Sequence, residues 1–147
     1  MSQPAPGYVL DAFALLAYLK GESRGRRVAE VLSEAAQGRC RARICTVNWA
    51  EALYILMREH GPAGQERADG LMAQLAVGFV PADRDLAASA ARLKVPGGLS
   101  LADCFAAALA RATDSVLLTG DPDFQKLEPE VRVEWLTEPE GEARPAT

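Results

Sequence analysis

Short apolar segments alternate with helical segments along most of this 147-residue chain, and this alternation limits the possible folds more than any other feature. Helices separate the apolar segments, so consecutive strands are expected to run parallel, with helices covering both faces of the sheet. The sequence therefore predicts an α/β fold with a central, mostly parallel sheet of about five short strands. These strands are predicted at residues 8–10, 41–46, 79–80, 115–119 and 131–136, the last at an edge.

Helices are predicted where apolar residues recur every three or four positions between residues that start or stop a helix. Gly21, Gly38 and Gly61 are the expected stops of the first three helices, while Asp83 and Ser100 are the expected caps of two later ones. The predicted helices are 12–20, 26–37, 49–60, one around residues 71–75, one that follows Asp83, and 101–112.

Composition and charge narrow the functional classes. Apolar residues make up 49% of the chain, which is typical of one globular domain, and the net charge of −4 gives no general attraction for a polyanion. If a phosphate backbone binds, a local feature must attract it. Asp11 interrupts the longest apolar run, the N-terminus has no basic region of a secretory signal, and the three cysteines form no CxxC pair. We therefore expect a cytoplasmic protein with buried thiols and no membrane segment.

Four acidic residues lie near the ends of predicted strands or the starts of helices. Asp11 directly follows the first strand, and Asp121 comes two residues after the strand 115–119. Glu51 is expected in the first turn of the helix that follows the second strand, and Asp103 in the first turn of the helix that Ser100 opens. Ligands of parallel α/β sheets bind beyond the carboxyl ends of the strands, so these side chains are expected to gather at one edge.

Each acid also has a purely structural interpretation. Asp11 could be a helix N-cap, and Asp121 could be a turn residue. Glu51 has the spacing to form a capping box with Asn48, and Asp103 has the same spacing from Ser100. Taken together, however, crowded carboxylates repel one another unless a cation lies between them. Mg²⁺ prefers such a set of carboxylates together with water and substrate phosphate, so the cluster points to metal-assisted phosphodiester hydrolysis.

In four segments, the chain resembles the PIN-domain nucleases, and specifically the VapC-type toxins of bacterial toxin–antitoxin pairs. The segments are VLDAFALL at 9–16, Ala50-Glu51, LSLAD at 99–103 with Ala106 to Ala108, and LLTGDPDF at 117–124. They follow the order of the family over residues 8–136. The last segment, a strand followed by Thr-x-Asp-x-Asp-Phe, is the most specific, and Ala50-Glu51 is the least specific.

The resemblance implies a PIN fold, dependence on Mg²⁺ or Mn²⁺, cleavage of RNA, homodimerisation and inhibition by a cognate antitoxin. It also implies a PIN domain at residues 8–136. The tail 137–147 is rich in Pro, Glu and Gly and is expected to be disordered, and residues 1–7 are expected to be a flexible N-terminus. By position, the resemblance assigns a catalytic quartet, three metal ligands among them, and two supporting residues. The catalytic quartet consists of Asp11, Glu51, Asp103 and Asp121. Within it, Asp11, Asp103 and Asp121 are the metal ligands. The supporting residues are Thr119 and Asp123.

Phe13 departs from the family pattern, because the family usually has Ser or Thr two places after the first Asp. Two alternatives stay open, and the missing hydroxyl supports only the first. One is a PIN-like module that binds nucleic acid or protein without catalysis. The other is a different metal-dependent phosphodiesterase, a DNA nuclease or a phosphatase, although phosphatases with an aspartate nucleophile need a second Asp where Phe13 stands.

An antitoxin is expected to dock in a groove between the helices 26–37 and 49–60.

Overall fold

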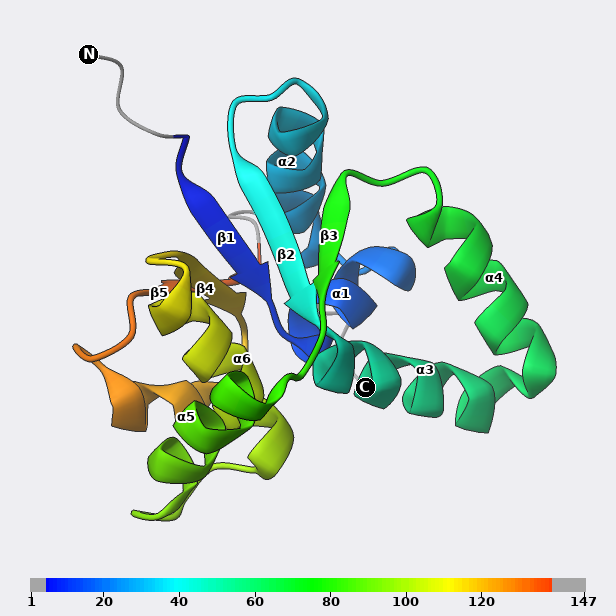
Figure 1. Cartoon of the computed structure of the whole chain (residues 1–147). Coiled ribbons are helices and arrows are strands. Elements are labelled where there is room, and N and C mark those ends of the chain that lie inside the picture. The colour runs from blue at the N-terminus through cyan, green and yellow to red at the C-terminus, as the bar shows by residue number, and fades with distance from the viewer. Residues whose placement is uncertain (1–4, 139–147) are drawn as a thin grey trace.

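A five-stranded sheet forms the centre of the computed structural model, which describes residues 5–138 (Figure 1). The strand order is β3-β2-β1-β4-β5, and every neighbouring pair is parallel, as the alternating pattern predicts. β5 is an edge strand, also as predicted. The strands are β1 (Gly7–Leu10), β2 (Arg41–Cys45), β3 (Val77–Val80), β4 (Val116–Thr119) and β5 (Val133–Trp135).

Helices cover both faces of this sheet (Figure 1). Alternate residues of a strand point to opposite faces, so Val9 and Leu117 pack with α5 and α6, while Leu10 and Leu118 pack with α2. The helices are α1 (Ala12–Leu19), α2 (Gly25–Ala36), α3 (Thr46–His60), α4 (Pro62–Met72), α5 (Arg84–Lys94), α6 (Leu101–Ala112) and the 3₁₀ helix η1 (Pro122–Leu127).

The most deeply buried helix is α6, whose residues 104–110 are all buried. Most of these residues are alanines, and their small side chains let the helix lie close to strands β1, β2 and β4. Ser100 caps the helix, because its Oγ accepts a hydrogen bond from the Asp103 backbone N–H at 3.1 Å. This packing fixes the first turn of α6, which carries Asp103.

Several element boundaries differ from the sequence prediction. The third helix begins at Thr46 and not at residue 49, since the extended backbone of Cys45 leads directly into it. β3 begins at Val77, two residues earlier than predicted, and η1 was not predicted. The last strand is shorter than 131–136, because the Val131 N–H donates to the Leu127 carbonyl in a turn and not to a neighbouring strand.

The predicted flexible ends, residues 1–7 and 137–147, overlap the described part of the chain only at residues 5–7 and 137–138. β1 begins at Gly7, one residue earlier than expected, and the Pro6 carbonyl accepts a hydrogen bond from the Arg41 N–H. The remainder of the predicted flexible ends falls mostly on residues 1–4 and 139–147, which lie outside the described residues. Over residues 5–138, no helix is long and apolar enough to cross a membrane. The three cysteines are buried and free, as predicted.

Candidate active site

The carboxyl ends of the adjacent strands β1 and β4 place Asp11 beside Thr119. Leu10 is in register with Leu118, so the residues that follow them meet at the sheet edge. The Thr119 hydroxyl donates a hydrogen bond to Asp11 Oδ2, although the two residues are 108 positions apart in sequence. The same hydroxyl oxygen accepts the Asp121 backbone N–H at 3.0 Å. One buried hydroxyl therefore joins two of the four predicted acids. This is where a residue that supports the acids, the role predicted for Thr119, would lie.

Asp11 is a helix cap and also part of the acidic group. Its Oδ1 accepts the Ala14 N–H at 2.8 Å at the start of α1, so the structural interpretation of this residue is confirmed. Its side chain is buried, and each of its oxygens has one hydrogen bond with capacity for another contact. Capping and metal binding are therefore compatible roles for this carboxylate.

Glu51 and Asp103 come from two helices that pack together, α3 and α6. Asp103 lies in the first turn of α6, as predicted. Glu51 does not lie in the first turn of its helix, because α3 begins five residues before it. The capping box of Asn48 with Glu51 is also wrong: Cys45 is the N-cap, without a side-chain hydrogen bond.

Asn48 is a residue whose role the sequence reasoning missed. It is fully buried, and its Nδ2 donates to the Ala102 carbonyl at 3.0 Å, which ties α3 to the first turn of α6. Its Oδ1 is buried and has no hydrogen-bond partner among the described residues. The available signal was a single amide between Val47 and Trp49 on an apolar helix, since a buried polar group needs a partner.

The electrostatics of the acids show that they share one environment. Burial raises the pKa of Asp11 to about 7, against the lowering effect of its bonds from Thr119 and Ala14, and repulsion from Asp103 and Asp121 adds to the rise. Burial likewise raises the pKa of Asp103 to about 6, and the carboxylates of Asp121 and Glu51 repel its charge.

The same effects act on Glu51, because burial and the charge of Asp121 raise its pKa. Asp123, in η1, is exposed; its N–H donates to Asp121 Oδ1 at 2.9 Å, and its charge also raises the pKa of Asp103. All four predicted acids and Asp123 thus interact at this edge, which we call the acidic edge.

The donor set of the acidic edge suits a hard divalent cation. Its side chains offer carboxylate oxygens, and the strongest charged neighbours of Asp11 and Asp103 are other carboxylates. The buried Asn48 oxygen without a partner lies between the two helices that carry Glu51 and Asp103. As they lie, no three Asp, Glu, His or Cys side chains of residues 5–138 form a group that could hold a metal ion. A cation would therefore have to draw these side chains closer together.

Phe13 lies against the backbone of the Thr119–Asp121 motif. A Cβ added at Gly120 would come within 2.6 Å of Phe13 Cζ, so only glycine fits beside the ring. The ring is half-buried and packs against the core on the α2 side of the sheet. The guanidinium of Arg24 lies over it, 5.8 Å from the ring centroid. Phe13 thus forms a wall beside the acidic edge in place of a hydroxyl.

A model of the PIN domain family matches residues 8–129, which is most of the chain. The chain belongs to the PIN domain family. This result confirms the predicted resemblance at the level of the family, and it agrees with the parallel α/β fold described above.

Several solved structures are similar to this chain over most of its length. They include VapBC2 from Rickettsia felis bound to a promoter DNA fragment, with a TM-score of 0.71, 15% identity and coverage of 89% of this chain and 99% of that chain. DNA-bound VapBC from Salmonella typhimurium has a TM-score of 0.71 and 16% identity, and the match covers 90% of this chain and 99% of that chain.

The sarcin–ricin loop cleaving toxin VapC20 from Mycobacterium tuberculosis has a TM-score of 0.66, 17% identity and coverage of 82% and 95%. At these identities, the similarities show a shared PIN fold. No curated protein matches the chain in sequence.

Proposed function

We propose that this PIN-domain chain is a metal-dependent endoribonuclease and the toxin of a VapBC-like toxin–antitoxin pair. The observation that carries the proposal is the acidic edge, where the Thr119 hydroxyl joins Asp11 to Asp121 and helices α3 and α6 add Glu51 and Asp103. The family membership and the similarity to VapBC structures support the same function. A silent binding module has no reason to keep buried acids that repel one another.

In this proposal Asp11, Asp103 and Asp121 hold Mg²⁺ or Mn²⁺, and Glu51 completes the catalytic quartet. A bound divalent cation would supply charge neutralisation and Lewis acidity toward the phosphoryl oxygens. Thr119 fixes the orientation of the Asp11 carboxylate through its hydrogen bond. Glu51, whose pKa is raised by burial and by the charge of Asp121, would accept a proton from an attacking water.

The catalytic proposal is tested by RNA cleavage with purified protein. We expect cleavage with Mg²⁺ or Mn²⁺, none with EDTA, and none for Asp103→Asn, which keeps the shape of the side chain and removes its charge. Asp85→Asn is the matched control, because Asp85 is an exposed residue in the first turn of α5. Full cleavage in EDTA or by Asp103→Asn would refute the proposed chemistry.

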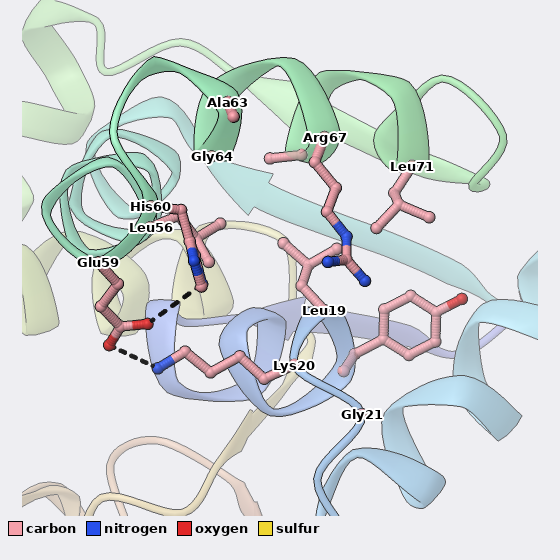
Figure 2. Close-up of a pocket in the computed structure, with 12 residues that line it drawn as sticks. Leu19, Lys20, Gly21, Leu56, Glu59, His60, Ala63, Gly64, Arg67 and Leu71 are labelled. Atoms are coloured by element: carbon pink, nitrogen blue, oxygen red, sulfur yellow. Dashed lines mark hydrogen bonds and ion pairs between the residues drawn. The ribbon is translucent and has the colours of Figure 1, made fainter.

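A cognate antitoxin is the proposed partner, since several similar structures are toxin–antitoxin complexes. A groove of about 830 Å³ lies between the end of α1 and the helices α3 and α4 (Figure 2). This groove differs from the one expected between the helices 26–37 and 49–60, because it is lined by α1, α3 and α4 and not by α2. Leu19, Leu56 and Leu71 give it apolar walls, and Figure 2 shows Arg67 reaching from α4 toward α1.

The charges of this groove indicate the chemistry of the partner. Lys20 and Glu59 pair across it at 2.9 Å, with His60 3.8 Å from the other oxygen of Glu59 (Figure 2). Arg67 is exposed and has no carboxylate partner among residues 5–138. An amphipathic antitoxin segment with apolar residues and an acidic group would fit both features.

Expression in bacteria tests the partner proposal. The chain alone should arrest growth, Asp103→Asn should not, and co-expression of a cognate small protein from a neighbouring reading frame should restore growth. Arg67→Glu should weaken this rescue without loss of RNA cleavage, whereas Arg92→Glu on the exposed face of α5 should not change it. Normal growth with an active enzyme would remove the toxin assignment and leave the nuclease. Homodimerisation stays a prediction.

A further inference from the structure

The acidic edge raises an electrostatic problem for an RNA substrate. The chain has a net charge of −4, and the strongest charged neighbours of Asp11 and Asp103 are carboxylates. A bound cation would serve the phosphate being cleaved, but the flanking phosphates would still approach an acidic surface. A cationic side chain beside the site would offset this repulsion and help to hold the RNA.

Three arginines lie at the start of α2, namely Arg24 at its N-cap and Arg26 and Arg27 in its first turn, and their surroundings differ. Arg27 is used within the fold: its Nε is 2.7 Å from Glu134 Oε2, its NH1 is 3.1 Å from Glu30, and its guanidinium lies over the ring of Tyr8.

Arg26 is not free to bind a ligand either, because it already makes an interaction within the protein. Arg24 has no carboxylate partner within residues 5–138, and its guanidinium contacts the Phe13 ring. Of the three, Arg24 is the arginine whose hydrogen-bonding groups stay available to a ligand.

Phe13 connects Arg24 to the acidic edge. The edge of its ring abuts Gly120, which lies between Thr119 and Asp121, while the guanidinium of Arg24 lies over the ring at 5.8 Å. The aromatic ring attracts the cation and also separates it from the carboxylates, so Arg24 lies beside the site without an ion pair to Asp11 or Asp121. With a serine or threonine in place of Phe13, this spacer would be absent.

We propose that Arg24, held by Phe13, binds a phosphate of the RNA strand next to the phosphate that is cleaved. The proposal rests on the ribonuclease function proposed above. A guanidinium can bind a phosphate with two parallel hydrogen bonds, which a lysine cannot do. Consecutive phosphates of one strand lie a few ångströms apart, so an arginine one ring away from the carboxylates reaches a neighbouring phosphate. Arg24 is then a substrate-binding residue, and Phe13 positions it.

The experiment compares Arg24→Gln, Arg24→Lys and the control Arg39→Gln with the unchanged protein. Arg39 is exposed in the turn before β2, at the opposite end of the strands from the acidic edge. RNA binding is measured by fluorescence anisotropy with a short single-stranded RNA of mixed sequence over about 50–200 mM salt. Cleavage kinetics and thermal unfolding are measured on the same samples.

For Arg24→Gln we expect KM and Kd to rise by about five- to tenfold, with kcat within about twofold. The slope of log Kd against log salt should fall by about 0.7 to 1, as for the loss of one phosphate contact. Arg24→Lys should recover the slope and part of the affinity, and Arg39→Gln should change neither. A purely structural role of Arg24 would lower the melting temperature without a change in the slope.

The outcomes separate this inference from the proposed function. Cleavage by the unchanged protein with an unaltered KM and slope in Arg24→Gln would refute the role of Arg24 and leave the nuclease intact. Binding that depends on Arg24 without any cleavage would refute the nuclease and keep the binding residue. The absence of both binding and cleavage would overturn both proposals.

Discussion

Asp11→Asn tests how strongly the acidic edge opposes folding when no cation is present. Burial raises the pKa of Asp11 from 3.8 to about 7, so the folded protein holds this proton more tightly than the unfolded chain does. Stability therefore falls as the pH rises from about 4 to about 7, and the full cost is present above that range. The difference between the two pKa values corresponds to about 4 kcal/mol.

The amide removes this charge but weakens the hydrogen bonding at the site. Asn keeps an oxygen for the Ala14 N–H but cannot accept the Thr119 hydroxyl with its amide nitrogen, which costs about 1 kcal/mol. In EDTA, Asp11→Asn should therefore be about 3 kcal/mol more stable than the unchanged protein at about pH 8. At about pH 5 most of the folded protein carries protonated Asp11, and the gain should fall below about 1 kcal/mol.

Urea unfolding followed by circular dichroism measures both free energies. The control is Asp85→Asn on the exposed first turn of α5, which should change stability by less than about 1 kcal/mol at either pH. If Asp11→Asn gave no gain at the higher pH, or the same gain at both, the argument from burial would be wrong. A loss of stability at both pH values would mean that capping by Asp11 outweighs its charge.

Three further predictions concern the same edge. Gly120→Ala should lower the free energy of unfolding by about 1–3 kcal/mol, because its Cβ overlaps the Phe13 ring. In urea melts, the double variant with Phe13→Ser should lose less stability than the sum of the two single losses, because the overlap is then removed. Thr119→Val should weaken Mg²⁺ binding about tenfold or more in calorimetry, because Asp11 loses its hydroxyl donor; unchanged affinity would contradict this role. Mg²⁺ affinity should rise with pH between about 5.5 and 7.5, with proton release, because Asp11 and Asp103 must lose protons to bind it.

The sequence was sufficient to predict the parts of the site that depend on strand ends. Asp11 and Asp121 follow apolar runs, and the parallel pairing of β1 with β4 brings the ends of those runs together. The supporting role of Thr119 came from the family motif, and its hydrogen bond to Asp11 agrees with that role. Periodicity and topology are enough for such residues, because the backbone alone determines which strand ends are neighbours.

Other parts of the site depend on tertiary packing that a linear pattern does not encode. Asn48 has the spacing of a capping residue, but the helix begins two residues before it and its amide bonds to α6. Phe13 signalled a missing hydroxyl in the sequence, whereas its contact with Gly120 and Arg24 follows from how α1 packs beside β4. These contacts join residues far apart in the chain, so neither local propensity nor spacing could predict them.

The position of β4 in the sheet also determines when the acidic edge can form during synthesis. β1 lies between β2 and β4, and the hydroxyl that joins the first acid to the last comes from a residue 108 positions later in the chain. A nascent chain that ends before residue 116 has Asp11 without Thr119, Asp121 or the strand that carries them. Contacts of such high sequence separation close last, after loop entropy has been overcome. The messenger RNA and the ribosome that make this protein are therefore exposed only to an incomplete site until nearly the whole domain has emerged.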